Sequence, residues 1–308
     1  MDNMSNDKLE QKIAIIGAGA VGSTIAYSAM VKNLAAEIIL VDLNKDKERG
    51  EVLDMCDALS FCETNIVRVG GYKDVADSDI IILTAGVAQK PGESRLDLVT
   101  KNKSIVSSIF KEIGNIKSTA IIVVVSNPVD VITYLVQEIS GLPKNQVFGT
   151  GTCLDSARLR SNLAKRLSVD GKQIDGFVLG EHGDGEFVAW STVSVAGKPI
   201  AEILSPEEMN NVYEEVKNEV YEIIKLKGAT YYGIAMAVVD ILEALILNQN
   251  KILPVSYRLE NYNGVSDICL GATAVVGSNG IIKSWPIELN EIEQNKFQDS
   301  AKKIKEYI

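Results

Sequence analysis

The stretch GEHGD contains His182, the one histidine of the chain. The ordinary pKa of imidazole lies close to neutral pH, so this side chain can take up and release a proton under physiological conditions. An earlier stretch, LDSAR, places Asp155 and Arg158 three residues apart, which puts both on one face of a helix. There Asp155 could orient His182 and favour its protonated form, and Arg158 could bind a carboxylate through two parallel N–H bonds. A surface ion pair and a structural histidine are the alternatives for these residues.

Three glycines stand where an apolar run gives way to a helical pattern. Gly17, Gly19 and Gly22 in IIGAGAVGS would allow a tight turn that brings the backbone close to a pyrophosphate at the positive end of a helix. Asp42 ends the next apolar run, twenty residues after Gly22. Its carboxylate could accept the ribose hydroxyls and would repel a 2′-phosphate, which favours NAD over NADP as the cofactor. The alternatives are an ordinary strand-to-helix turn and a solvated acid.

The elements that must position these residues follow an alternating order in the first half of the chain. Strands are expected at 12–19, 36–44, 65–70, 79–86, 119–128 and 146–151, and helices at 22–33, 45–61, 98–114 and 129–140. Continuous Ile/Val runs with helices between them predict a parallel sheet covered on both faces. The expected fold class is α/β, with a Rossmann-type doubly wound parallel sheet forming an NAD-binding domain over residues 1–150.

The pattern changes after about residue 150. A helix at 155–168, short alternating runs at 173–182 and 186–197, long helices between 206 and 248, hairpin strands at 251–259 and 268–280 and a terminal helix at 290–308 are expected. They predict an α+β catalytic and substrate domain over residues 151–308. No linker rich in Pro, Gly or Ser separates the halves, so we expect an intimate interface between them.

Composition narrows the class of protein. A hydrophobic fraction of 46% with 23% charged residues is typical of a packed globular chain. The net charge of −10 argues against a general binder of nucleic acid or of anionic membranes. The four cysteines have no paired metal spacing, the first ten residues have no apolar signal core, and the apolar segments are too short or too interrupted to span a membrane. We therefore expect a cytoplasmic protein with reduced thiols.

The motifs taken together are more specific than any one of them. GAGAVG, AGVAQKPGESRLDL, VVSNPVD, GTCLDSAR and GEHGD follow one another over essentially the whole chain, and this set resembles the lactate and malate dehydrogenase family. The resemblance implies that His182 is the catalytic acid and base, that Asp155 orients it and that Arg158 anchors the substrate carboxylate. It also implies that Arg95, in a lid loop at 86–97, polarises the substrate ketone when the loop closes.

The resemblance extends to cofactor and substrate contacts. It implies that Asn127 lies near the nicotinamide and the substrate oxygen, that Thr230 lines the substrate pocket and that Ile234 packs on the nicotinamide. Val21 in the glycine turn is a further expected cofactor contact. The family resemblance also implies a homotetramer, with a dimer as the second choice.

Gln89 is the position expected to decide which hydroxy acid is used. Malate dehydrogenases carry an arginine at the matching place, and glutamine is neutral. A dicarboxylate would then bring an uncompensated charge into the closed site, which is strongly disfavoured. We expect hydride transfer between NADH and pyruvate giving L-lactate. A malate or a branched-chain L-2-hydroxy acid dehydrogenase is the alternative, since the sequence does not reveal the pocket volume.

Regulation and the remaining rival functions rest on a few positions. Many bacterial lactate dehydrogenases bind fructose 1,6-bisphosphate through an arginine and a histidine. Arg160 matches the arginine but Asp175 stands at the histidine position, so we expect weak or absent activation.

A metal enzyme using Cys153 and His182 would have two ligands without a carboxylate cluster, so no metal is expected. A non-enzymatic NAD-binding protein would not need the catalytic set.

Overall fold

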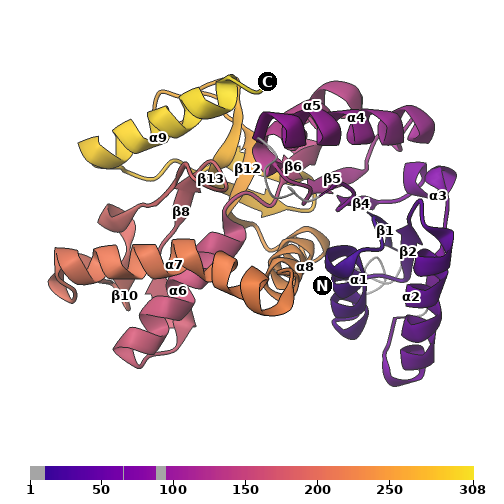
Figure 1. The fold of residues 1–308 in the computed structure, drawn as a ribbon, viewed down its shortest axis with the longest axis horizontal. Helices are drawn as coiled ribbons and strands as arrows, with labels where there is room; N and C mark the ends of the chain where they lie inside the picture. Colours follow the sequence, from indigo (N-terminus) through magenta and orange to yellow (C-terminus); the bar gives the residue numbers. More distant parts are fainter. Residues whose placement is uncertain (1–10, 65, 88–94) are drawn as a thin grey trace, which may run out of the picture.

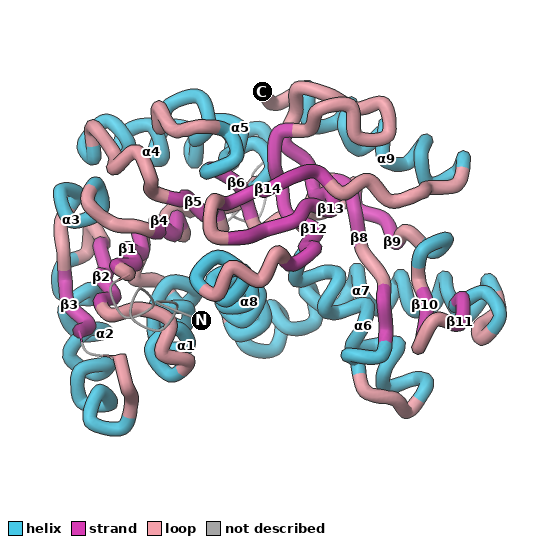
Figure 2. Tube along the Cα trace, turned by 180° about the vertical axis from the view of Figure 1, so that it is seen from behind, coloured by secondary structure: helices cyan, strands magenta, loops and turns pink. Residues whose placement is uncertain are grey.

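The computed structural model describes residues 11–64, 66–87 and 96–308. For Arg95 it describes the backbone but not the side chain. Its main sheet begins with six parallel strands in the order β3-β2-β1-β4-β5-β6 (Figures 1 and 2). Their bounds are β1 Lys12–Ile16, β2 Glu37–Val41, β3 Ile66–Val69, β4 Ile80–Leu83, β5 Ile121–Val124 and β6 Val147–Gly149. Strands β4, β5 and β6 are buried throughout because they carry no polar side chain on either face.

Helices cover both faces of these strands (Figures 1 and 2). Helices α1, α2 and α8 pack with one set of strand side chains, and α3, α4 and α5 pack with the other. Their bounds are α1 Ala20–Val31, α2 Lys45–Ala58, α3 Tyr72–Ala76, α4 Arg95–Ile113, α5 Val129–Ile139 and α8 Tyr232–Ile246. The two packed layers confirm the doubly wound α/β fold expected from the sequence.

The strand order reverses between β1 and β4, which are neighbours although two strands separate them in the chain. In doubly wound sheets a crevice opens at such a point, beyond the carboxyl ends of the strands. The glycine turn follows β1 directly, and Thr84 follows β4. The Oγ1 of Thr84 donates to the carbonyls of Ile16 and Gly17 at 3.0 and 3.1 Å and so joins the two strand ends.

Five strands of the second half of the chain extend the same sheet. Ser256 of β12 pairs with Gly149 of β6 in an antiparallel bridge, and the sheet continues through β13, β8 and β9, with β14 on β13. The bounds are β8 Val178–Gly180, β9 Glu186–Val188, β12 Lys251–Arg258, β13 Cys269–Gly277 and β14 Gly280–Ser284. One hydrophobic core includes residues of both halves, which is the intimate contact expected.

The remaining elements frame the outer side of this half. They are α6 Cys153–Leu167, α7 Pro206–Lys227, α9 Glu291–Lys305 and a small sheet of β7 Ile174–Asp175, β10 Ser194–Val195 and β11 Lys198–Pro199. Leu159 and Leu163 of α6 pack with Val212 and Val216 of α7. In the part of the chain that the structure describes, no helix is long and apolar enough to cross a membrane.

The structure corrects three local expectations. Helix α4 begins at Arg95, so Arg95 stands in the first helical turn and not in the loop expected at 86–97. Helix α3 was not expected, because five residues are too few to show a helical period. The run expected at 186–197 is broken after β9 by a 3-10 turn at Trp190–Thr192.

Candidate active site

The glycine turn between β1 and α1 has the geometry that its spacing predicts. Gly17 has φ +110°, a conformation that residues with a Cβ rarely adopt. A Cβ added to Gly22 would lie 1.9 Å from the carbonyl oxygen of Gly17, so this position needs a glycine for the helix to pack on the turn. Nothing lies within 4 Å of a Cβ added to Gly19, and no side chain caps the N-terminus of α1 there. Free backbone N–H groups beside open space can receive a phosphate.

Asp42 closes the other side of the glycine turn. Its Oδ2 accepts a hydrogen bond from the backbone N–H of Ala18 at 2.6 Å, and its Oδ1 accepts one from the N–H of Asn44 at 2.8 Å. The carboxylate after β2 therefore lies against the turn after β1. This is the place from which an acid could receive ribose hydroxyls.

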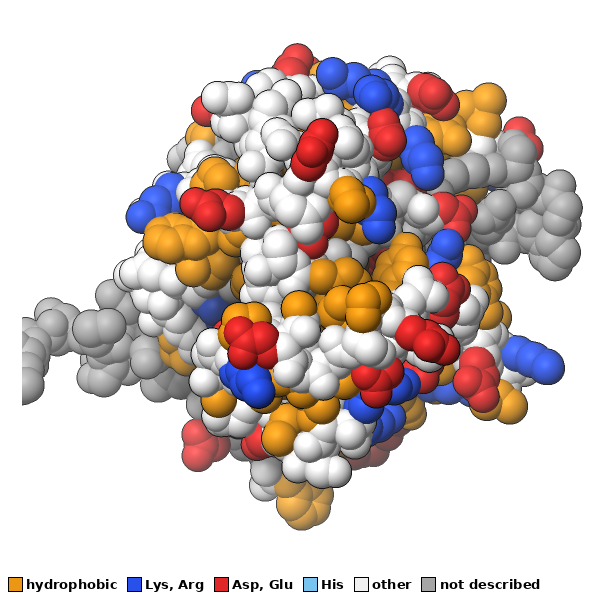
Figure 3. Space-filling model, turned by 90° about the vertical axis from the view of Figure 1, so that its left-hand side faces the viewer, with side chains coloured by type: hydrophobic (Ala, Val, Ile, Leu, Met, Phe, Trp, Pro, Cys, Tyr) orange, Lys and Arg blue, Asp and Glu red, His pale blue; other side chains and the backbone are white. Residues whose placement is uncertain are grey.

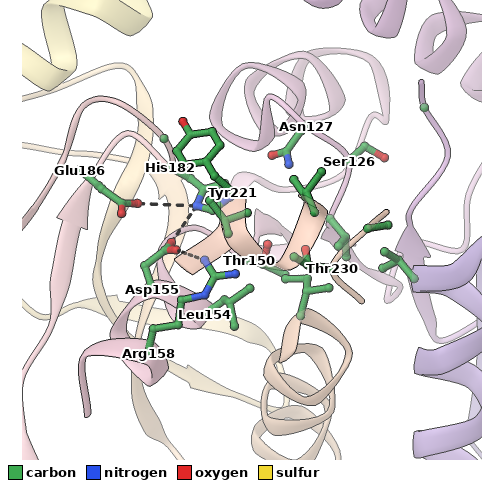
Figure 4. A pocket seen from close by; sticks show the side chains of 18 of the residues that line it. Ser126, Asn127, Thr150, Leu154, Asp155, Arg158, His182, Glu186, Tyr221 and Thr230 are labelled. Carbon is green, nitrogen blue, oxygen red and sulfur yellow. Dashed lines mark hydrogen bonds and ion pairs between the residues drawn. The ribbon is translucent and has the colours of Figure 1, made fainter. Parts of the chain in front are cut away.

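A cavity of about 610 Å³ lies between the two halves of the chain. Seven of the residues named from the sequence line it: Val21, Asn127, Asp155, Arg158, His182, Thr230 and Ile234. They come from α1, the segment after β5, α6, the segment after β8, the segment before α8 and α8 itself. Figure 4 labels Asn127, Asp155, Arg158, His182 and Thr230 among them. The structure thus brings together residues that are up to 213 positions apart.

Within this cavity Asp155 connects His182 and Arg158 (Figure 4). Oδ2 of Asp155 lies 2.7 Å from Nδ1 of His182, and Oδ1 accepts a hydrogen bond from Nη1 of Arg158 at 3.1 Å. The side chains of Asp155 and Arg158 are 3% and 10% exposed, whereas that of His182 is 27% exposed. Because Nδ1 faces Asp155, Nε2 is the nitrogen that can meet a substrate.

The electrostatics of this pair favour an imidazolium beside a carboxylate. Burial by itself lowers the pKa of His182, but the charge and hydrogen bond of Asp155, with Glu186 and Asp130 behind them, raise it to about 9. Burial works to raise the pKa of Asp155, but His182 and Arg158 outweigh it and hold that pKa below its usual value. His182 therefore carries a proton to donate at neutral pH.

Glu186 is a site residue that the sequence reasoning did not single out. It stands at the start of β9, and its Oε2 lies 3.9 Å from Nδ1 of His182. Burial, followed by the negative charge of Asp155, raises the pKa of Glu186 to about 8. Two neighbouring acids thus differ in charge at pH 7, with Asp155 ionised and Glu186 protonated. The signal in the sequence was its place four residues after His182 in GEHGDGE.

Asn102 on α4 supports the segment that carries Asn127. Its Nδ2 donates to the carbonyl of Asn127 at 2.7 Å and to that of Val87 at 3.1 Å, and its Oδ1 accepts from the N–H of Val87 at 2.9 Å. Asn102 is 1% exposed. It was also absent from the sequence reasoning, because the contact joins residues 25 positions apart.

Other expected positions are not among the residues that line the cavity or lie outside the described residues. Gln89 and the side chain of Arg95 are outside the residues that the structure describes. Arg160 lies on α6 with Nη1 3.4 Å from the carbonyl oxygen of Gly176, next to the exposed Asp175.

The rival metal pair of Cys153 and His182 is not the set that the fold assembles. Burial raises the pKa of Cys153, so its sulfur stays a thiol, and its Sγ donates to the carbonyl of Pro254 at 3.6 Å. The described residues that could share an ion are Asp155, His182 and Glu186, whose ligand atoms lie within 4.8 Å of one another. Arg158 already pairs with Asp155 at that point, which disfavours a cation.

Comparisons with known proteins agree with this architecture. Residues 11–149 match the family model of the lactate/malate dehydrogenase NAD binding domain, and residues 152–308 match that of the lactate/malate dehydrogenase alpha/beta C-terminal domain. An L-lactate dehydrogenase of Acetivibrio thermocellus is 44% identical, covering 99% of this chain and 98% of its own. The L-lactate dehydrogenase 1 of Clostridium acetobutylicum is 43% identical, covering 98% of both.

Solved structures give the same result. The crystal structure of minor L-lactate dehydrogenase from Enterococcus mundtii, in a ligand-bound form, has a TM-score of 0.93 at 41% identity and covers 97% of this chain and 98% of its own. A lactate dehydrogenase from a deep-sea metagenome library has a TM-score of 0.92 at 36% identity, with the same coverage.

Proposed function

The chain belongs to the lactate and malate dehydrogenase family, and on this premise we propose that it is an NAD-dependent L-lactate dehydrogenase. It would transfer hydride reversibly between NADH and pyruvate. The observation that carries the proposal is the His182–Asp155–Arg158 arrangement in a cavity beside the glycine turn. A proton donor and a carboxylate anchor are the two groups that reduction of a 2-oxo acid requires besides hydride.

The cofactor site fits a dinucleotide. The uncapped start of α1, the open space at Gly19 and the carboxylate of Asp42 are suited to a pyrophosphate and a ribose. Val21 and Ile234 line the cavity and would contact the nicotinamide end. When bound, NADH supplies the hydride. The negative charge of Asp42 would disfavour the 2′-phosphate of NADP.

The chain's own residues would do the rest of the chemistry. Nη1 of Arg158 donates to Asp155, and further N–H groups of the guanidinium can bind the substrate carboxylate in parallel. Nε2 of His182 would donate its proton to the ketone oxygen as the hydroxyl forms, and Asp155 would stabilise the ring in the protonated form. Asn127 and Thr230 line the same cavity and would orient the substrate.

Gln89 and the side chain of Arg95, which lie outside the described residues, have further proposed roles. Arg95 would place its guanidinium on the ketone oxygen, where negative charge grows as hydride arrives. Gln89 would leave no cation for a second carboxylate, so pyruvate would be preferred to oxaloacetate. A malate or branched-chain L-2-hydroxy acid dehydrogenase is the second candidate, and Gln89 is the reason that the malate activity ranks below.

A substrate panel tests this proposal. NADH oxidation is followed with pyruvate, oxaloacetate and 2-oxoisocaproate side by side, repeated with NADPH and with fructose 1,6-bisphosphate. We expect the highest kcat/KM with pyruvate and NADH. We also expect little change in KM on adding the sugar bisphosphate, because Asp175 beside Arg160 repels phosphate. Higher kcat/KM with oxaloacetate would overturn the substrate assignment, and no oxidation with any 2-oxo acid would overturn the activity.

A further inference from the structure

Asp130 is a buried carboxylate for which the proposed chemistry has no use. It is the second residue of α5 and is 1% exposed. It is not among the residues that line the cavity. An acid so deeply buried destabilises the fold unless donors and a favourable field hold it. The N-terminal turn of a helix supplies part of that field.

The two oxygens of Asp130 reach across the boundary between the halves of the chain. Oδ2 accepts a hydrogen bond from the backbone N–H of His182 at 3.0 Å. Oδ1 accepts one from the hydroxyl of Ser256 at 2.6 Å. Ser256 is 0% exposed and belongs to β12, the strand that continues the sheet from β6. Asp130 lies in the first half, and these two donors lie in the second.

His182 is consequently held by two carboxylates. Asp155 holds the ring at Nδ1, and Asp130 holds the backbone from the opposite half of the molecule. A neutral side chain such as asparagine could accept the same backbone N–H. A carboxyl group in place of such an amide therefore calls for a reason beyond the hydrogen bond.

We propose that Asp130 is a positioning residue for His182, which fixes the histidine across the boundary and places a second negative charge behind its ring. The proposal rests on the proposed function, in which His182 is the proton donor. Asp130 would act in two ways. Its hydrogen bond would fix the position of the imidazole ring, and its charge would raise the pKa of the ring.

The surroundings of His182 support the role of the charge. The titratable and charged side chains near it include Asp155 and Arg158 on α6, Glu186 on β9, Glu181 and Asp184 beside it in the chain, Lys217 and Tyr221 on α7, and Asp130 on α5. Asp130 is one of the groups that raise the pKa of His182. Because it is buried and is not among the residues that line the cavity, bound substrate would not displace it.

The single histidine makes a direct experiment possible. Protein without a polyhistidine tag, labelled with ¹³C or ¹⁵N at histidine, gives the His182 titration by NMR without any assay of activity. Asp130→Asn keeps an acceptor for the His182 N–H and removes the charge. Glu138→Gln makes the same chemical change on the exposed part of the same helix and serves as the control.

We expect the His182 midpoint near pH 9 in the wild type, lower by on the order of half a unit in Asp130→Asn, and unchanged in Glu138→Gln. The pH midpoint of kcat/KM for pyruvate should fall by the same amount. Asp130→Ala, which removes the acceptor as well, should have a kcat about tenfold lower than that of Asp130→Asn, because the ring is then less well positioned. An Asp130→Asn midpoint equal to that of the wild type overturns the proposal.

A second variant keeps the proposal testable if Asp130→Asn does not fold. Ser256→Ala removes a donor and leaves the Asp130 charge less compensated, so the His182 midpoint should rise, in the opposite direction to Asp130→Asn. A midpoint that stays or falls contradicts the proposal. If the midpoints move as expected but the wild type reduces no 2-oxo acid, the positioning of His182 stands and the proposed function fails.

Discussion

At the scale of single residues, the candidate site is defined by acids that the fold keeps in different charge states. His182 and Arg158 keep the pKa of Asp155 low, so Asp155 is ionised. Burial and the nearby charge of Asp155 raise the pKa of Glu186 to about 8, so Glu186 is protonated at neutral pH. The negative charge in the cavity therefore increases when Glu186 ionises. That charge would lie near the place where Arg158 meets a substrate carboxylate.

The ionisation of Glu186 should weaken substrate binding at alkaline pH. Below its pKa of about 8 the group is neutral, and above it the new charge repels a carboxylate. We expect KM for pyruvate to rise between about pH 7 and pH 9.5 in the wild type and to rise less in Glu186→Gln. Steady-state kinetics across this range measure the effect. Glu222→Gln, on the exposed face of α7, is the control, and equal KM profiles for Glu186→Gln and the wild type would refute the role of Glu186.

At the scale of elements, the glycine turn has two roles, helix packing and cofactor binding. Variants of two of its glycines can distinguish these roles. Gly22 provides room for α1 to pack on the turn, because a Cβ there would lie 1.9 Å from the carbonyl oxygen of Gly17. Gly19 borders open space and would face the cofactor. The first glycine serves the fold and the second serves binding.

Alanine at each position should therefore have a different effect. Gly22→Ala should lower the free energy of unfolding by about 3 kcal/mol, since the backbone must move apart. Gly19→Ala should leave stability unchanged and raise the Kd for NADH on the order of tenfold, as expected for one lost close contact. Urea unfolding and NADH fluorescence titration measure the two effects. Stability lost in Gly19→Ala, or kept in Gly22→Ala, would contradict this division.

The elements with a clear period were predictable from the sequence, and the contacts between distant elements were not. The Ile/Val runs of β4 and β5 and the long pattern of α7 give strong local signals. The continuation of the sheet depends on the pairing of Ser256 with Gly149, which no local pattern contains. Likewise, Asp130 and its two donors are 52 and 126 positions apart, so its role could not be read from the sequence.

At the scale of the whole molecule, the two halves behave as one body with a cavity between them. They share a sheet and a hydrophobic core. On the face shown in Figure 3, acidic and basic side chains are interspersed with hydrophobic ones. The net charge of −10 belongs to the whole chain, so it does not argue against the proposed binding of a carboxylate by Arg158 in the cavity.

The assembly expected for this family is a homotetramer, and we propose it for this chain. Sedimentation equilibrium at several protein concentrations should give the mass of four copies of the 33.4-kDa chain. The mass should stay constant when NADH is added, because the described residues proposed to contact NADH all come from one copy. A monomer at micromolar concentration would exclude the tetramer, and a mass of two copies would favour the dimer.

The most direct test of the central claim compares kcat for pyruvate reduction in the wild type and in His182→Gln, with NADH affinity measured in both. We predict that kcat falls about a thousandfold, as expected when a positioned acid is lost, while the Kd for NADH stays the same. Wild-type turnover in His182→Gln would contradict the claim that this imidazolium supplies the proton.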